Sequence, residues 1–176
     1  YMSACGLYRG WIDGKPVSDA VFMPGATDYR KRIPYQTYDV TELLRKEEGE
    51  SGSHTLDIWL ADGWYRGSIG CFGPTNVFGR QTKLLCQMEI TYENGGREMV
   101  LSDGSFSWSN DGPIRFADLE DGEIVDASMT PSYSGKAMET KEEVVPTAGD
   151  NVLPKEKERF TAKLLTTPSG KKVLDF

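Results

Sequence analysis

The sequence of 176 residues lacks several features that would place it in a familiar class. No apolar run approaches the length that crosses a bilayer, and no signal peptide is visible, so we expect no membrane partner and the sequence leaves the compartment open. Its three cysteines, Cys5, Cys71 and Cys86, show no Cys-x-x-Cys spacing, which favours buried free thiols over a disulfide framework. His54 is the only histidine, which argues against structural zinc and against a histidine-based triad.

The motifs of common enzyme and nucleotide sites are also missing. There is no G-x-S-x-G, no P-loop and no G-x-G-x-x-G pattern. The glycines Gly67, Gly70 and Gly73 do not have the spacing of a nucleotide-binding motif, and we interpret them as an exposed loop. The net charge of −7 predicts that the protein does not bind nucleic acid, because phosphate would be repelled overall.

What the sequence does contain is a series of short β-like runs separated by Gly, Asp and Asn. Strands are expected at 6–12, 33–40, 55–61, 82–92, 97–101, 105–109, 114–116 and 124–129. Asp13-Gly14 has the chemistry of a hairpin turn, and Thr41–Leu44 is expected to form one helical turn capped by Thr41 or Asp39. We therefore predict a single all-β domain over residues 1–176, a jelly-roll-like β-sandwich with one or two short helical turns.

The last third of the chain differs in composition. Residues 131–157 are rich in Ser, Gly, Glu, Lys and Pro, which predicts a long surface excursion. Residues 158–176 are expected to contain a closing hairpin, 160–165 with 172–176, that leads into a next domain.

A set of motifs resembles a known family over nearly the whole length. The motifs are Gly6-Leu-Tyr, 13–17, 24–44, Asp62-Gly-Trp-Tyr-Arg-Gly67, 111–114, 121–123, Asp126-Ala127, Thr167-Pro168-x-Gly170 and Leu174-Asp-Phe176. In order and spacing they resemble the N-terminal β-sandwich domain of bacterial α-L-rhamnosidases, inverting glycoside hydrolases that remove terminal rhamnose. The family usually has Asn where this chain has Asp13, which a turn tolerates, and residues 133–152 match weakly.

The resemblance implies a non-catalytic, accessory role. The family's catalytic carboxylates lie in a downstream α/α barrel, so no catalytic residue is assigned here and the fragment alone is not expected to be an enzyme. The implied partners are that barrel, in the same polypeptide, and rhamnose-containing glycosides. We expect further sequence before Tyr1 and beyond Phe176. The alternatives are a purely structural domain that supports the barrel, or a freestanding adhesion or interaction module.

Loop residues suggest where a sugar would bind. Saccharide sites place aromatic faces against the apolar side of a pyranose, with carboxylates and amides on its hydroxyls. The run from Asp62 to Arg66 is expected to end a strand and enter a loop on which other loops converge. The predicted carbohydrate-binding residues are Asp62, Trp64, Tyr65, Asn76, Asn110 and Asp111. The alternative is that Trp64 and Tyr65 serve in core or domain packing.

Calcium is the candidate cofactor. The resemblance implies it, since some relatives bind L-rhamnose with calcium through loop Asp and Asn residues, and the predicted ligands are Asp62, Asn110 and Asp111. The densest acidic cluster is Asp118, Glu120, Asp121, Glu123 and Asp126. It is interpreted as a solvated turn or as a calcium or sugar-hydroxyl site, without the ligand pattern of an EF-hand.

Overall fold

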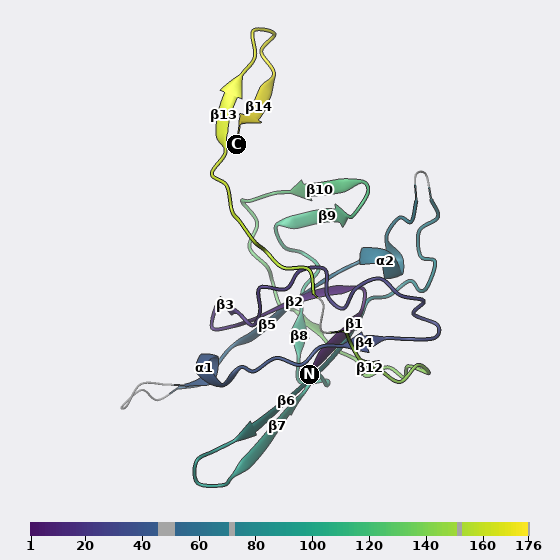
Figure 1. Cartoon of the computed structure of the whole chain (residues 1–176), viewed down its shortest axis with the longest axis vertical. Coiled ribbons are helices and arrows are strands. Elements are labelled where there is room, and N and C mark those ends of the chain that lie inside the picture. Colours follow the sequence, from purple (N-terminus) through teal and green to yellow (C-terminus); the bar gives the residue numbers. More distant parts are fainter. Residues whose placement is uncertain (46–51, 71–72, 151–152, 176) are drawn as a thin grey trace.

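The computed structural model describes residues 1–45, 52–70, 73–150 and 153–175. These residues form short strands and two helices of one turn each, which confirms the predicted all-β class (Figure 1). The strands are β1 (Met2–Cys5), β2 (Leu7–Ile12), β3 (Lys15–Pro16), β4 (Pro34–Tyr35), β5 (Leu56–Ala61), β6 (Lys83–Thr91), β7 (Arg97–Leu101), β8 (Ser107–Trp108), β9 (Ile114–Asp118), β10 (Gly122–Val125), β11 (Gly135–Lys136), β12 (Thr147–Ala148), β13 (Lys163–Thr166) and β14 (Lys172–Asp175). The helices are α1 (Thr41–Leu44) and α2 (Gly63–Arg66). No helix in the described ranges has the length and apolarity to span a bilayer.

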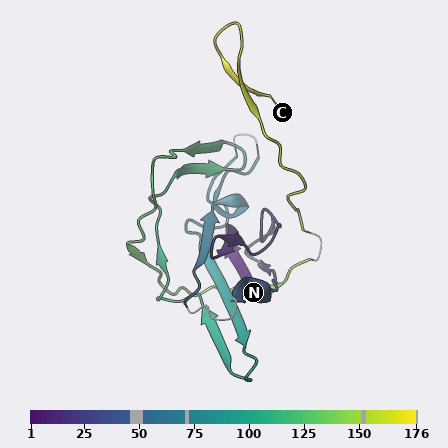
Figure 2. The same ribbon diagram turned by 90° about the vertical axis from the view of Figure 1, so that its left-hand side faces the viewer.

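The longest strand, β6, is the centre of one antiparallel sheet of order β1-β6-β7. Met2 pairs with Cys86 on one side of β6, and Gln87 pairs with Leu101 on the other. The β6–β7 hairpin was predicted from the sequence, and its turn places Gly95 at a φ of 83°, which glycine adopts without strain. Its far end extends away from the body of the molecule (Figure 2).

A second antiparallel sheet has the order β3-β2-β5. The predicted turn between β2 and β3 is present, with φ of 49° at Asp13 and 74° at Gly14. Side chains alternate along β2: Tyr8 and Ile12 are buried, whereas Arg9 and Trp11 lie on the opposite, outer face. The sheet therefore has one face on the core and one face towards solvent.

The core consists of two clusters. The first contains Met2, Ala4, Tyr8, Ala20, Met23 and Cys86, and the second contains Cys5, Tyr29, Ile33 and Tyr65. The Tyr8 hydroxyl donates to Oε1 of buried Gln36 at 2.7 Å and lies 2.9 Å from the Tyr38 hydroxyl. Burial raises the pKa of Tyr8 well above its usual value, so this internal network contains a neutral phenol.

The strand predicted over 33–40 is wrong in its extent, because only Pro34–Tyr35 forms β4. Gln36 makes an isolated bridge to Met2, with both of its backbone groups bonded there. Asp39 then turns to the helix α1, where its Oδ1 accepts hydrogen bonds from the Thr41 N–H at 3.0 Å and hydroxyl at 2.6 Å. The predicted helical turn at Thr41–Leu44 is confirmed.

The segment 131–157 runs mostly exposed over the surface, yet it is bonded to the body at several points. Its strand β12 pairs in parallel with β4, and β11 pairs with β8. Val144 packs on the second core cluster, and Leu153 packs on the first. Lys83 Nζ bonds Glu142 at 2.6 Å. Contacts distant in sequence thus fix a segment whose composition alone indicates only a loop.

Candidate functional site

The predicted loop after β5 is instead the helical turn α2, a correction to the sequence interpretation. The Arg66 N–H donates to the Asp62 carbonyl, and Arg66 Nη1 lies 3.3 Å from Asp62 Oδ1. Gly63 has a φ of 50°, and a Cβ on it would lie 2.5 Å from Leu7 Cγ. The turn forms because glycine allows this close approach to β2.

The two aromatic residues of α2 pack inward. Tyr65 is 7% exposed, and its ring meets Tyr29 edge-on at 5.2 Å between centroids. Trp64 packs on the same cluster and lies edge-on to Phe22 at 6.2 Å. Both rings therefore pack against other side chains of the chain, as the packing alternative expects. A sugar contact at Trp64 or Tyr65 stays a prediction.

The other predicted residues fall into two groups. Asn76 lies against α2, since its N–H donates to the Arg66 carbonyl at 2.8 Å. Asn110 and Asp111 line a separate cavity of about 270 Å³ with Trp108. Over the described ranges, no hydrogen bond or ion pair joins these groups, and no cluster of three or more His, Cys, Asp or Glu side chains could hold a metal. Calcium at Asp62, Asn110 and Asp111 stays a prediction.

Carboxylates of the acidic cluster bind the chain's own amides. Asp118 Oδ2 accepts from the Ser68 N–H at 2.8 Å, and Glu120 Oε1 accepts from the Gly70 N–H at 2.7 Å. The backbone hydrogen bonds from Ser68 and Glu120 hold the pKa of Asp118 below its usual range. In this structure these carboxylates anchor the loop after α2 to the β9–β10 hairpin.

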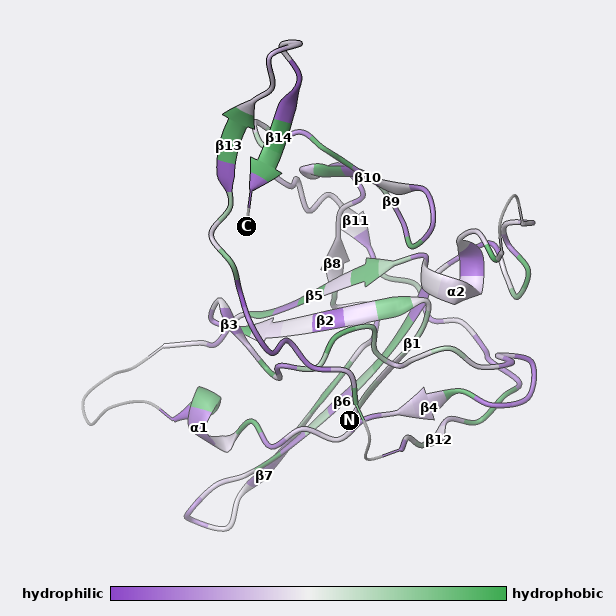
Figure 3. Ribbon diagram, turned by 45° about the horizontal axis from the view of Figure 1, so that its top comes forward, coloured by the Kyte–Doolittle hydropathy of each residue, from purple (hydrophilic) through white to green (hydrophobic). Residues whose placement is uncertain are grey.

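The structure brings together a group that the sequence interpretation did not select, on the outer face of the β3-β2-β5 sheet. Figure 3 shows the three strands of this sheet. Trp59 lies directly opposite Arg9, and Trp11 lies between Asp57 and Pro16. Residues opposite one another in an antiparallel pair share a face, so the two tryptophans and Arg9 are neighbours. The indole centroids are 4.8 Å apart, and Arg9 Cζ lies 5.6 Å from the Trp11 centroid. Trp59 is 54% exposed.

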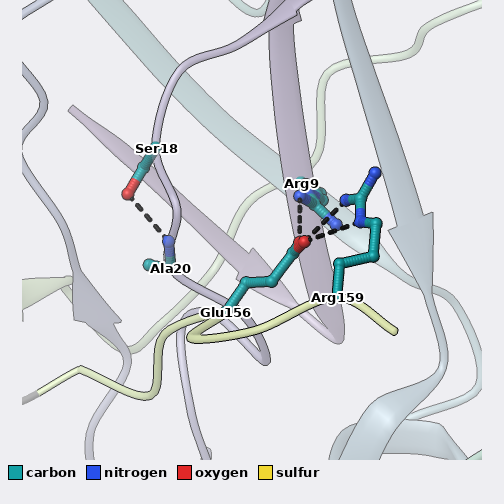
Figure 4. Close-up of polar contacts among 5 residues, drawn as sticks. All are labelled: Arg9, Ser18, Ala20, Glu156 and Arg159. Carbon is teal, nitrogen blue, oxygen red and sulfur yellow. Dashed lines mark hydrogen bonds and ion pairs between the residues drawn. The ribbon is translucent and has the colours of Figure 1, made fainter. Parts of the chain in front are cut away.

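Arg9 and Pro16, the neighbours of Trp11, also line a cavity of about 420 Å³. It is lined by Arg9, Pro16, Ser18, Asp19 and residues 156–159. The Glu156 carboxylate lies between two guanidinium groups, accepting from Arg159 Nε at 2.9 Å and Nη2 at 2.6 Å, with Arg9 Nη2 at 3.6 Å (Figure 4). Three cationic and three acidic side chains line this cavity, so it is balanced in charge although the whole chain has a net charge of −7.

The backbone holds this cavity in shape. The Val21 N–H donates to the Pro154 carbonyl at 2.9 Å, and the Glu156 N–H donates to the Asp19 carbonyl at 3.0 Å. Ser18 Oγ accepts from the Ala20 N–H at 3.0 Å. Alternation in 6–12 and 55–61 could have placed Trp11 and Trp59 on sheet faces, but their register and the approach of Glu156 depend on tertiary contacts.

Comparison with known proteins gives a consistent result. A family model described as the α-L-rhamnosidase N-terminal domain matches residues 1–163. An α-L-rhamnosidase of Streptomyces avermitilis is 36% identical over 157 residues, which are 89% of this chain and 15% of that protein. One from Formosa agariphila is 36% identical over 142 residues, 80% of this chain and again 15% of the relative. The chain thus spans about 15% of the length of these relatives.

Solved structures agree with the sequence comparisons. The crystal structure of the Streptomyces avermitilis α-L-rhamnosidase complexed with L-rhamnose has a TM-score of 0.82 at 33% identity, covering 99% of this chain and 18% of that one. Native α-L-rhamnosidase from Aspergillus terreus has a TM-score of 0.75 at 30% identity, covering 99% of this chain and 21% of that one.

Proposed function

The chain belongs to the family of α-L-rhamnosidase N-terminal domains, and from this membership we propose that it packs, as a non-catalytic domain, against the rest of such an enzyme. In this proposal residues 1–176 are the accessory part of a protein that hydrolyses terminal α-L-rhamnosides. The catalytic groups belong to a downstream α/α barrel of the same polypeptide, which acts on rhamnose-containing glycosides.

The observation that supports packing best is the β13–β14 hairpin. Leu164 pairs with Leu174, and Leu165 pairs with Val173, so each face of the hairpin has one apolar pair. Leu164 and Leu174 are 65% and 60% exposed. A lone two-stranded hairpin is marginal in water, and apolar pairs on both faces favour a place between two covering layers.

The neighbouring β9–β10 hairpin has the same character. Phe116 pairs with Ile124, and these side chains are 44% and 61% exposed. The β13–β14 hairpin extends away from the body of the molecule, whereas β9–β10 lies along the edge of the body (Figures 1 and 2). The family match ends at residue 163, where β13 begins. Together these features supply an apolar surface of the kind that a neighbouring domain covers.

The use of the acidic residues agrees with a non-catalytic role. Glycoside hydrolysis needs two carboxylates that flank the scissile bond. Asp118 and Glu120, from the densest acidic cluster, are instead bonded to backbone amides of the loop after α2. Hydrogen bonds of this kind stabilise the fold, which is the role that the proposal gives to these two carboxylates.

Co-purification tests the packing proposal. The chain is co-expressed with the remainder of its parent polypeptide, and the two parts are expected to elute together in size-exclusion chromatography. The double variant Leu164→Ser, Leu174→Ser is expected to weaken this association at least about tenfold, because each serine removes a large apolar side chain from the contact.

The matched control is Met138→Ser, Val145→Ser, since these side chains are 89% and 77% exposed and lie in the 131–157 segment. Separate elution of the wild-type parts contradicts the packing proposal. Hydrolysis of an aryl α-L-rhamnoside by the chain alone contradicts its non-catalytic role.

Carbohydrate binding is a second candidate function. Asn110 and Asp111 line a polar cavity beside half-exposed Trp108, and amide and carboxylate groups beside an aromatic ring suit a saccharide. In the background Trp59→Phe, the double variant Asn110→Ala, Asp111→Ala is expected to abolish the change of tryptophan fluorescence on adding L-rhamnose with calcium. An unchanged response in this variant excludes the two residues as ligands.

A further inference from the structure

We propose that the outer face of the β3-β2-β5 sheet binds a neutral saccharide, with a pyranose ring against Trp59 and hydroxyls in the cavity beside Arg9. This site is separate from the apolar hairpins and from the residues selected by sequence, so it goes beyond the packing role. Its failure would leave the co-purification result unchanged.

The aromatic half of the site is the pair of tryptophans. Trp59 is 54% exposed although it lies on a strand in the middle of a paired region of β2 and β5. Trp11 lies beside it on the same face, at 4.8 Å between centroids and with the ring planes at 49°. A large ring held by a neighbour loses little conformational freedom on binding, and its apolar face suits the C–H side of a pyranose.

The polar half of the site consists of side chains that are already paired with one another. Arg9 lies between the Trp11 ring and the Glu156 carboxylate, and Glu156 in turn is held by Arg159. Arg9 Nε is buried and has no hydrogen-bond partner among the described residues. Buried donors without partners are rare in folded proteins, and where they occur a functional role or an ordered water commonly explains them. Guanidinium donors and carboxylate acceptors side by side match the mixed donors and acceptors of sugar hydroxyls.

Size and charge select the ligand class. The cavity of about 420 Å³ falls within the range of small-ligand sites. Arg9 and Arg159 are already paired with Glu156, and the lining has equal numbers of cationic and acidic side chains. A phosphate or carboxylate ligand would add negative charge beside the three acidic side chains of the lining, Asp19, Glu156 and Glu158. A neutral saccharide meets no such repulsion, so it is the favoured occupant.

The test is an NMR titration of the whole ¹⁵N-labelled chain with L-rhamnose, followed through the four tryptophan indole N–H signals, each assigned by a Trp→Phe variant. In buffer without calcium, the signals of Trp59 and Trp11 are expected to shift and saturate at millimolar sugar, while those of Trp64 and Trp108 stay in place. Parallel titrations with D-glucose and D-galacturonate measure the preference for a neutral ligand.

Variants separate stacking from general effects of mutation. Trp59→Ala is expected to weaken binding at least about tenfold, because the platform is lost, whereas Trp59→Phe retains binding within about threefold. Tyr92→Ala is the matched control, since Tyr92 is 48% exposed, follows β6 and lines neither cavity. Because Trp59 is half exposed, the remaining amide signals of Trp59→Ala are expected to report the native fold.

Four outcomes overturn the proposal: no saturable shift with either neutral sugar, shifts at Trp108 alone, wild-type affinity in Trp59→Ala, or tighter binding of D-galacturonate than of both neutral sugars.

Discussion

Strand β2 and the β13–β14 hairpin obey the same pairing rules but differ in what covers them. Every second residue of β2 is buried against the core, whereas all residues of β13 and β14 are exposed. The apolar side chains of β2 stabilise this chain, and those of the hairpin add little to it. An apolar strand is thus not by itself evidence of a buried core, because only the tertiary structure shows whether other parts of the chain cover it.

The largest expected effect tests this contrast directly. Ile12, at the end of β2, is 2% exposed, so Ile12→Ala is expected to lower the free energy of unfolding by about 2–5 kcal/mol. Leu174→Ala, at a position 60% exposed, is expected to change it by less than about 0.5 kcal/mol. Urea denaturation followed by tryptophan fluorescence measures both values. Equal losses in the two variants would show that the hairpin is part of the cooperative core.

Two glycines extend the comparison to the backbone. Both have positive φ, but a Cβ on Gly63 would meet Leu7 Cγ at 2.5 Å, whereas a Cβ on Gly170 meets nothing within 4 Å. Gly63→Ala is expected to destabilise the chain by about 1–3 kcal/mol, through strain and displacement of β2. Gly170→Ala has only the backbone strain of the hairpin turn, about 1 kcal/mol, and that strain is local. Thermal unfolding by circular dichroism checks the order, and a larger loss for Gly170→Ala would reverse it.

The smallest expected effect concerns the 131–157 segment. The hydrogen bond from Lys83 holds the pKa of Glu142 below its usual value. A carboxyl whose pKa is lower in the folded state stabilises the fold above its unfolded pKa, and this stability is lost as the pH falls through the folded pKa. Because the pair is about one third exposed, the contribution is below about 1 kcal/mol.

Glu142→Gln is therefore expected to flatten the acid limb of the stability curve slightly and leave stability at pH 7 nearly unchanged. Unfolding measurements between about pH 3 and pH 7 in wild type and variant give the difference. Glu123→Gln, in the exposed strand β10, is the control. An identical pH dependence in wild type and Glu142→Gln would remove any role for the pair in holding this segment.

Local pattern predicted those elements whose partners are close in sequence. The β6–β7 hairpin, the Asp13-Gly14 turn, the helical turn at Thr41–Leu44 and the closing hairpin all follow from alternation and turn chemistry. The prediction failed over 33–40 and 62–67. There the outcome depends on Gln36 reaching Met2 and on Gly63 fitting against Leu7, which are contacts between distant residues.

The candidate site shows the same division. Asn110 and Asp111 lie on the surface near one cavity, whereas Tyr65 is buried and Asp62 is paired with Arg66. A short motif identifies the residue types at a site but not the face on which each side chain lies. The Arg9, Trp11 and Trp59 group was missed because its members meet only through the register of β2 and β5.

By itself the sequence determined the all-β class, the family, the local turns and the balance of charge, because these depend on residues near one another or on composition. Tertiary structure alone decided which aromatic rings are buried, which hairpins have no cover and where Glu156 meets Arg9 and Arg159. The physical reason is that burial and pairing between distant segments are set by the free energy of the whole packed chain, which no local pattern contains.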